Sequence, residues 1–481
     1  MLQRIFKDSI IYGITGIFTR GVSLIMVPFY TRVLSPEDYG IIDILTIFGA
    51  LVNFIVALEI SQGVARHYVD TESRNEKVSY ASSGLWSVIV AYGIFAIITV
   101  KFSAPFSILL LGGSRWTPIF KLAVTAMAAN GIYFLLLDLL RWQFKPKFYG
   151  ISSLVYTIFT TGAAAYLIMI CRIGVSGIFI GQIIGAIIGS LAAWYFSRGL
   201  YAFCFNWKKY KQMLSFSLPL VPSSIAVFLS FYIDRICIRH YMTLADVGIY
   251  GIGFRLGSII SLLIISVRGS LIPLIYQSYK DPATPEKIGK IFRFFLSCAL
   301  PLYVFLSIYS REFLYFLTVP VFYKGWSVIP LLGLSILLTE IYIFAPGLGI
   351  AKKTKKIALL NIVSFGLNVG LNIMLIPFMG IIGAAMATSM AAFFSFAARI
   401  KFSQKLYPIP YNWRRIILAL AVSFSGVTVG LLISVENTEF SIEYLLVKFF
   451  IFIIAVLLIG SILIRKEDLA SLTKKFGWKL V

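Results

Sequence analysis

The sequence predicts an all-α, polytopic membrane protein with about fourteen transmembrane helices. Hydrophobic residues make up 59% of its 481 residues and charged residues only 13%, whereas soluble domains carry about 45–50% and about 25%. Apolar stretches of about 20 residues, the length that crosses a hydrocarbon core as a helix, recur along the whole chain. Because these stretches are continuously apolar and not alternating, we expect helices and not barrel strands.

The expected spans follow one another with short connections. They are 9–30, 40–64, 79–100, 118–140, 150–170, 176–196, 213–238, 247–276, 291–309, 325–349, 357–377, 380–400, 415–434 and 444–464. With the amino terminus inside, the loops and ends on that side carry 27 Lys and Arg, and those on the opposite side carry 7. Short loops obey the positive-inside rule, so both termini are expected in the cytoplasm.

Several function classes have no support in the sequence. No GxxxxGK[ST] phosphate loop occurs, the four cysteines show no CxxC spacing, and neither histidine lies in an HExxH context. We therefore expect no cofactor, no metal and no enzymatic activity. The formal charge of +23 comes from basic residues spread over short loops and not from one patch, so no nucleic-acid partner is expected.

An internal repeat relates the two halves of the chain. Residues 35–40 (SPEDYG) correspond to 243–248 (TLADVG) at an offset of 208, and 174–177 (GVSG) to 380–383 (GIIG) at an offset of 206. Six helices per repeat return the chain to its starting side, which predicts parallel repeats of the kind found in secondary transporters. The expected domains are 1–208, 209–402 and an appended 403–481.

Three further motifs stand out along nearly the whole chain: residues 28–40 (PFYTRVLSPEDYG), 232–235 (YIDR) with 248–250 (GIY), and 377–385 (PFMGIIGAA). In these motifs the sequence resembles the polysaccharide transporter branch of the multidrug/oligosaccharidyl-lipid/polysaccharide exporter superfamily, the O-antigen flippases and their relatives.

The resemblance implies two six-helix lobes around a cavity in a bacterial cytoplasmic membrane. It implies movement of a polyprenyl-pyrophosphate-linked oligosaccharide, an O-antigen, capsule or exopolysaccharide unit, by alternating access. It also implies membrane lipids, a polysaccharide polymerase and chain-length proteins as partners. A peptidoglycan-precursor flippase, a membrane-embedded polymerase or glycosyltransferase, and an assembly scaffold remain open as alternatives.

Ionisable residues inside the spans are candidate functional groups because charge in a bilayer is costly. They are Arg20, Asp43, Glu59, Asp138, Asp234, Arg235, Arg255, Arg268 and Glu340. Arg20 and Glu340 lie closest to mid-depth. Asp43, Asp138, Asp234 and Arg235 fall near helix ends, where snorkelling or capping is favoured. Arginines in a cavity suit an anionic substrate because guanidinium offers paired donors to phosphate.

We expect Arg20 to bind the pyrophosphate, with Arg255 as a second contact nearer the outer side and Asn53 as a deep polar neighbour. Glu59 and Arg268 lie at nearly equal depth in opposite lobes, which predicts an ion pair when the cytoplasmic side closes. Glu340 is a further gating or ion-coupling candidate. The sequence leaves open whether the coupling ion is H⁺ or Na⁺.

A polar stripe marks the eleventh span. Asn361, Ser364, Asn368 and Asn372 recur at spacings of three and four and therefore share one helix face. This face suits either contact with sugar hydroxyls in the cavity or hydrogen bonding between helices. By contrast, the glycines at 177, 181, 185 and 189 predict close helix packing.

Overall fold

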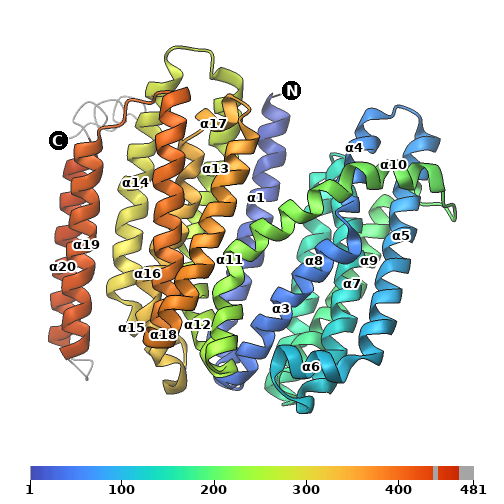
Figure 1. Ribbon diagram of the computed structural model, residues 1–481, viewed down its shortest axis with the longest axis horizontal. Coiled ribbons are helices and arrows are strands. Elements are labelled where there is room, and N and C mark those ends of the chain that lie inside the picture. The colour runs from blue at the N-terminus through green and yellow to red at the C-terminus, as the bar shows by residue number, and fades with distance from the viewer. Residues whose placement is uncertain (1, 437–441, 465–481) are drawn as a thin grey trace. The chain divides into compact units, whose positions relative to one another are not determined.

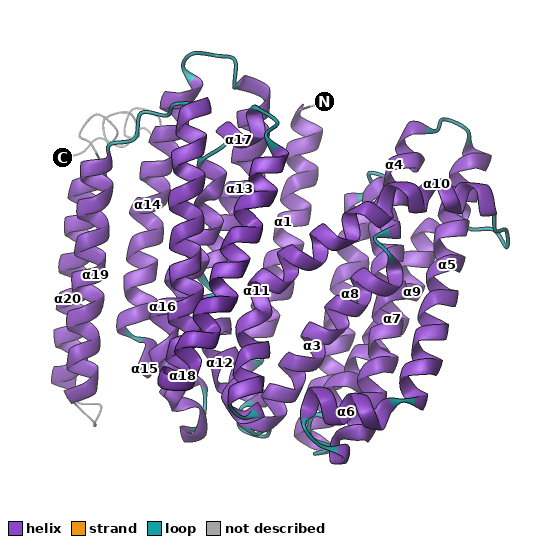
Figure 2. Cartoon of the chain, viewed as in Figure 1, coloured by secondary structure: helices purple, strands orange, loops and turns teal. Residues whose placement is uncertain are grey.

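The computed structural model describes residues 2–436 and 442–464, and these residues form helices and connecting segments without a β-strand (Figure 1, Figure 2). They group into two compact units, residues 1–251 and 252–481. The boundary falls inside one helix, and the predicted boundaries after residues 208 and 402 stay predictions.

The first unit is built from twelve α-helices, the last of which continues into the second unit. They are α1 (Leu2–Ile25), α2 (Val27–Tyr30), α3 (Pro36–Ala57), α4 (Ile60–Asp70), α5 (Arg74–Lys101), α6 (Ser103–Leu111), α7 (Thr117–Trp142), α8 (Pro146–Ala165), α9 (Ser176–Ser197), α10 (Trp207–Ser217), α11 (Val221–Tyr241) and α12 (Leu244–Gly257). Its main core includes Val64, Tyr92 and Leu139, contributed by α4, α5 and α7.

The second unit contains the remaining helices. They are α13 (Ile260–Ser278), α14 (Thr284–Ile308), α15 (Ser310–Leu317), α16 (Ile329–Glu340), α17 (Gly347–Ile350), α18 (Thr354–Leu406), α19 (Trp413–Glu436) and α20 (Ile442–Leu463), with 3₁₀ segments at Pro320–Val328 and Ile341–Phe344. One core joins α13, α14, α16, α19 and α20 around Phe292, Ala419 and Ile459.

Twelve helices among the described residues are long and apolar enough to cross a membrane. They coincide with thirteen of the fourteen expected spans, because α18 contains both 357–377 and 380–400. The chain reverses inside α18 at Gly380, whose φ of 57° and ψ of −136° suit only glycine. The remaining expected span, 247–276, is divided between α12 and α13. The all-helical membrane fold is confirmed, and the count of fourteen stays a prediction.

The second expected helix, 40–64, is wrong as one continuous element. It breaks between α3 and α4, where Leu58 and Glu59 both adopt left-handed backbone conformations with φ of 50° and 52°. Neither residue is glycine, so two successive left-handed residues store strain. No glycine or proline marked this break in the sequence.

The repeat predicted from 35–40 and 243–248 is visible in local geometry. Ser35 and Asp38 form a capping box at the start of α3, with reciprocal bonds of 3.2 and 2.9 Å. Thr243 and Asp246 repeat it at the start of α12, with bonds of 3.2 and 3.1 Å. Each pair satisfies otherwise unpaired amides of a helix N-terminus.

The two helix starts cross in direct backbone contact. A Cβ atom on Gly40 would lie 1.8 Å from the carbonyl oxygen of Leu244, and one on Gly248 would lie 2.0 Å from that of Pro36. Adding the repeat offset of 208 to positions 36 and 40 gives 244 and 248. The two contacts are therefore equivalent under the internal repeat. The crossing is therefore locally twofold, as parallel repeats require.

The glycines of the second repeat pair share a positive φ. Gly174 and Gly380 both adopt positive φ, 64° and 57°, immediately before the helical segments that they start. The glycine stripe of α9 packs as predicted: Cβ atoms on Gly181 and Gly185 would lie 2.7 and 1.8 Å from atoms of Thr160 on α8. The packing interpretation of this stripe is confirmed.

Candidate functional site

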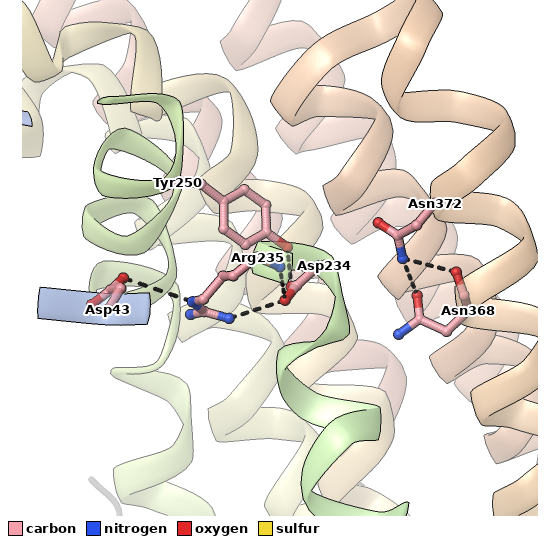
Figure 3. A network of polar contacts seen from close by, with 6 residues as sticks. All are labelled: Asp43, Asp234, Arg235, Tyr250, Asn368 and Asn372. Atoms are coloured by element: carbon pink, nitrogen blue, oxygen red, sulfur yellow. Dashed lines mark hydrogen bonds and ion pairs between the residues drawn. The ribbon is translucent and has the colours of Figure 1, made fainter. Parts of the chain in front are cut away.

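A buried charge network occupies the first unit, where α3, α11 and α12 meet (Figure 3). Nη1 of Arg235 lies 3.2 Å from Oδ1 of Asp234, and Nε lies 3.7 Å from Oδ2 of Asp43. The hydroxyl of Tyr250 donates a hydrogen bond to Asp234. The Arg235 guanidinium also lies 5.2 and 5.4 Å from the ring centroids of Tyr232 and Tyr250.

This network corrects the expectation that its members reach the membrane interface. Asp43, Asp234 and Arg235 are 8%, 1% and 3% exposed, so their side chains are enclosed by protein and do not snorkel. The position of a residue near a helix end indicates its depth in the membrane. Whether its side chain is enclosed by protein depends on which other helices pack against that end. The sequence signal that was available is the run Tyr232–Arg235, which places an acid and a base next to each other.

Arg20 and Asn53, the predicted substrate contacts of the first unit, have different surroundings. Arg20 is exposed on α1 and takes part in a polar or electrostatic contact. Asn53 is half-buried on α3, and its Oδ1 accepts a 2.7 Å hydrogen bond from the hydroxyl of the buried Tyr92. Asn53 therefore has one acceptor already engaged. Their predicted role in substrate binding stays a prediction.

The second unit carries a cluster of charged residues around Tyr342, which we call the Tyr342 cluster. Arg268 on α13 forms an ion pair with Glu340 at the end of α16. Arg399 on α18 donates a hydrogen bond to Oδ1 of Asn361. The two guanidinium carbons lie 5.6 and 5.1 Å from the centroid of the Tyr342 ring. Three predicted residues are thus brought together with two that the sequence analysis missed.

The Tyr342 cluster is suited to bind an anion. It holds two guanidinium groups and one carboxylate, and Tyr342 is 39% exposed. Nε of Arg268 is buried and has no hydrogen-bond partner among the described residues. A guanidinium with unused donors can bind a phosphate group. An exposed aromatic ring beside it can pack against a ring-shaped substituent of the same ligand. Arg399 was overlooked because it stands in the last turn of an otherwise apolar span.

The polar stripe of α18 shares one helix face, as its spacing predicted, and that face is turned toward the protein. Asn368 and Asn372 are 4% and 0% exposed, and the side-chain amide of Asn372 donates to both the backbone oxygen and Oδ1 of Asn368 at 2.8 Å (Figure 3). Oδ1 of Asn372 is buried without a hydrogen bond among the described residues. These contacts favour a packing role for Asn368 and Asn372, whereas Asn361 joins the Tyr342 cluster.

Glu59, Arg255 and Arg268 were the other predicted gating and binding residues. Glu59 lies at the strained break between α3 and α4. Arg255 is half-buried on α12 and has a polar or electrostatic contact. Arg268 is engaged with Glu340 in this structure, so its predicted pairing with Glu59 stays a hypothesis about another conformation.

A second buried ion pair was missed. Nζ of Lys448 on α20 lies 2.5 Å from Oε1 of Glu312 on α15 and 2.7 Å from the carbonyl oxygen of Ile308. Lys448 is 0% and Glu312 4% exposed. The surrounding apolar run of α20 concealed the lysine. Among residues 2–436 and 442–464, no cluster of three His, Cys, Asp or Glu side chains is suited to hold a metal.

Solved structures with the same fold are transporters. The lipid II flippase MurJ in an inward closed conformation matches with a TM-score of 0.73 and 17% identity, over 98% of this chain and 100% of that one. A MATE-family multidrug transporter in an inward-facing conformation matches with a TM-score of 0.62 and 14% identity, over 80% of this chain and 94% of that one. The chain therefore has the fold of a multi-pass membrane transporter.

A family model described as polysaccharide biosynthesis protein matches residues 5–279, more than half of the chain. The protein belongs to this family, which confirms the resemblance seen in its motifs. A Haemophilus influenzae protein of the Lsg locus is 24% identical over 290 residues, 58% of this chain and 68% of that protein. The succinoglycan biosynthesis transport protein ExoT of Rhizobium meliloti is 23% identical over 271 residues, 56% of this chain and 52% of ExoT. The protein is a multi-pass membrane protein of the polysaccharide biosynthesis family with the fold of these transporters.

Proposed function

We propose that this protein moves a polyprenyl-pyrophosphate-linked oligosaccharide from the cytoplasmic to the outer leaflet of a bacterial cytoplasmic membrane by alternating access. The observation that carries the proposal is the Tyr342 cluster, in which two arginines share one ring and only one carboxylate opposes them. A pyrophosphate needs cationic donors, and a sugar ring needs a flat apolar surface beside them. A carrier of cationic drugs would instead gain from unpaired carboxylates.

The main alternative is transport of the peptidoglycan precursor lipid, whose headgroup also carries a pyrophosphate. The likeness to MurJ supports the fold and leaves this choice open. The family and the relative named for succinoglycan transport favour an oligosaccharide of an envelope or secreted polysaccharide. A polymerase and chain-length proteins of the same pathway are the proposed partners, and H⁺ or Na⁺ is the proposed coupling ion.

Reconstitution into vesicles tests the proposal. Purified protein should move a fluorescent polyprenyl-pyrophosphate oligosaccharide to the opposite leaflet, where an added glycosidase cleaves it. Arg399→Gln and Arg268→Gln should each lower the rate about tenfold or more, the loss expected when one charge-assisted contact is removed. Arg66→Gln is the matched control, because Arg66 forms only an exposed pair with Asp70.

Two outcomes would contradict the proposal. Equal rates for Arg399→Gln, Arg268→Gln and the wild type would remove the Tyr342 cluster from substrate binding. Transport of lipid II at a higher rate than any oligosaccharide carrier would favour the peptidoglycan alternative. A pH gradient and a Na⁺ gradient are then imposed separately on the same vesicles. The gradient that changes the transport rate identifies the coupling ion.

A further inference from the structure

A groove of about 380 Å³ opens in the first unit between α3, α6 and α11. Its walls are apolar side chains, among them Ile44, Ile47 and Leu51 of α3 and Leu109 of α6. Leu109 is 76% exposed and Ile236, on the wall formed by α11, is 37% exposed, so the groove opens on the outside of the unit. The apolar lining of the groove is therefore accessible from outside the first unit.

One end of the groove is cationic. Arg239 and His240, in the last turn of α11, complete the lining. Nε of Arg239 donates a 3.3 Å hydrogen bond to the carbonyl oxygen of Leu110, and among the described residues no carboxylate pairs with Arg239. An arginine without an acid partner at the margin of a membrane span is costly unless water or an anion compensates it.

The position of Arg239 is built into the fold. A Cβ atom on Gly112, which ends α6 with a φ of 79°, would lie 2.0 Å from Nη2 of Arg239. A side chain at position 112 would therefore displace the end of the Arg239 side chain, and the φ of 79° itself favours glycine. The guanidinium of Arg239 lies against the C-terminus of α6, where its Nε also donates to the carbonyl oxygen of Leu110.

The groove is amphipathic along its length. Arg239 lies two residues from the end of α11, whereas Ile44 and Leu51 line α3 over seven residues, about 10 Å of helix. A charged end near the helix terminus and an apolar floor that runs inward match the arrangement of a lipid in a leaflet, with its phosphate at the interface and its chain in the core. The connection between α11 and α12, Met242 and Thr243, lies within the segment 239–246 that the sequence analysis expects on the extracytoplasmic side. With that segment outside, the site belongs to the outer leaflet.

We propose that this groove binds an anionic glycerophospholipid, with its phosphodiester at Arg239 and His240 and one acyl chain along α3 and α6. The charge decides the class of lipid. One guanidinium balances the single negative charge of a phosphodiester, whereas a diphosphate would need more cationic groups. The residues that line the groove include no carboxylate to pair with the ammonium group of a zwitterionic headgroup, which favours an anionic lipid. The site is separate from the Tyr342 cluster, and the proposal does not depend on which glycan is transported.

Photo-crosslinking in nanodiscs tests the site with the full-length protein. A phosphatidylglycerol analogue with a diazirine on one acyl chain should label residues 44–51 and 103–111, and the phosphatidylcholine analogue should label them about tenfold less. Arg239→Gln should lower phosphatidylglycerol labelling about tenfold. Arg239→Lys, which keeps the charge, should retain most of it. Arg115→Gln is the matched control, because Arg115 is 67% exposed and pairs with Glu37 outside the groove.

The thermal unfolding midpoint of each variant is measured alongside the labelling. A variant that unfolds at the wild-type temperature has lost lipid binding and not its fold. Gly112→Ala, which displaces the guanidinium of an intact Arg239, should reproduce the loss of labelling. Equal labelling by the two analogues, or unchanged labelling in a folded Arg239→Gln protein, would overturn the proposal. Stronger displacement by geranylgeranyl diphosphate than by phosphatidylglycerol at equal concentration would overturn the choice of a phosphodiester.

Discussion

Arg235 and Asp43 form a buried ion pair, with Nε and Oδ2 3.7 Å apart, for which the internal repeat provides no equivalent. Subtracting 208 from 235 gives Val27, and adding 208 to 43 gives Gly251, neither of which carries a charge. The backbone contacts beside this pair obey the repeat, whereas the charges break it. Symmetric packing therefore does not account for this pair.

Removing the arginine of this network should be strongly destabilising. Arg235→Met leaves Asp234 and Asp43 without their common cation, a loss of about 3–5 kcal/mol for a buried pair broken on one side. Thermal unfolding in detergent, followed by tryptophan fluorescence, should show a clearly lowered midpoint. Arg66→Gln, in an exposed pair with Asp70, should leave the midpoint unchanged, and a wild-type midpoint for Arg235→Met would contradict the prediction.

The helix crossing should respond non-additively to added methyl groups. Gly40→Ala and Gly248→Ala each place a Cβ about 2 Å from a backbone oxygen of the facing helix, so each should lower the unfolding midpoint. Because both act on one crossing, the double variant should lose less than the sum of the two losses. Gly366→Ala is the control: nothing lies within 4 Å of its Cβ, and alanine in a helix should stabilise by about 0.5–1 kcal/mol. Simple additivity would show that the two contacts are independent.

Arg20 tests the anionic-substrate hypothesis from the first unit. Arg20→Ala should insert and fold normally, because the side chain is exposed, and should lose transport in the vesicle assay. Arg20→Lys keeps the charge but loses the paired donors of guanidinium and should retain part of the rate. Full transport by Arg20→Ala would remove Arg20 from substrate binding.

Charge exchange should separate the two proposed partners of Arg268. Arg268→Glu places two carboxylates opposite each other in this structure, its own and that of the observed partner Glu340. Adding Glu340→Arg in the same chain should therefore restore thermal stability. If Arg268 also pairs with Glu59 when the cytoplasmic side closes, Glu59→Arg combined with Arg268→Glu should restore part of the transport rate. A Glu59 double variant no better than its worse single variant would exclude that pairing.

The ion pair between α20 and α15 should hold the last helix against the second unit. Lys448→Met leaves the buried Glu312 uncompensated and should cost about 3–5 kcal/mol, whereas adding Glu312→Gln should recover much of this loss. Unfolding midpoints of the two single variants and the double variant give the coupling between the sites. Equal midpoints for Lys448→Met and the double variant would show that Glu312 is not the partner that matters.

Local patterns predicted the repeat correctly because they are properties of contiguous residues. The motif Ser35–Gly40 contains a capping box, a proline at the first helical position and a glycine one turn later, and each has a fixed place at a helix start. Its counterpart at Thr243–Gly248 repeats the box and the glycine. Both glycines proved to be where the helices touch.

Enclosure and pairing could not be predicted in the same way. Asp43 and Arg235 are 192 positions apart in the sequence, and only tertiary packing decides that they face each other and not the interface. Arg399 and Lys448 were missed because a strongly apolar neighbourhood outweighs one charge in any hydropathy window. The break at Leu58–Glu59 had no sequence signal, because neither of its two left-handed residues is glycine or proline.

The mated contacts at Gly40 and Gly248 have a consequence for the origin of the chain. The two contacts are equivalent under the repeat. Two identical half-length chains that associate through the same surface would form the same pair of equivalent contacts. Such an ancestral homodimer would already possess this crossing, with its two serine or threonine caps side by side. An identical homodimer would form the pair of Arg235 with Asp43 twice or not at all. The single pair in this chain, with Val27 and Gly251 at the equivalent positions, is therefore a feature that only two diverged halves can have.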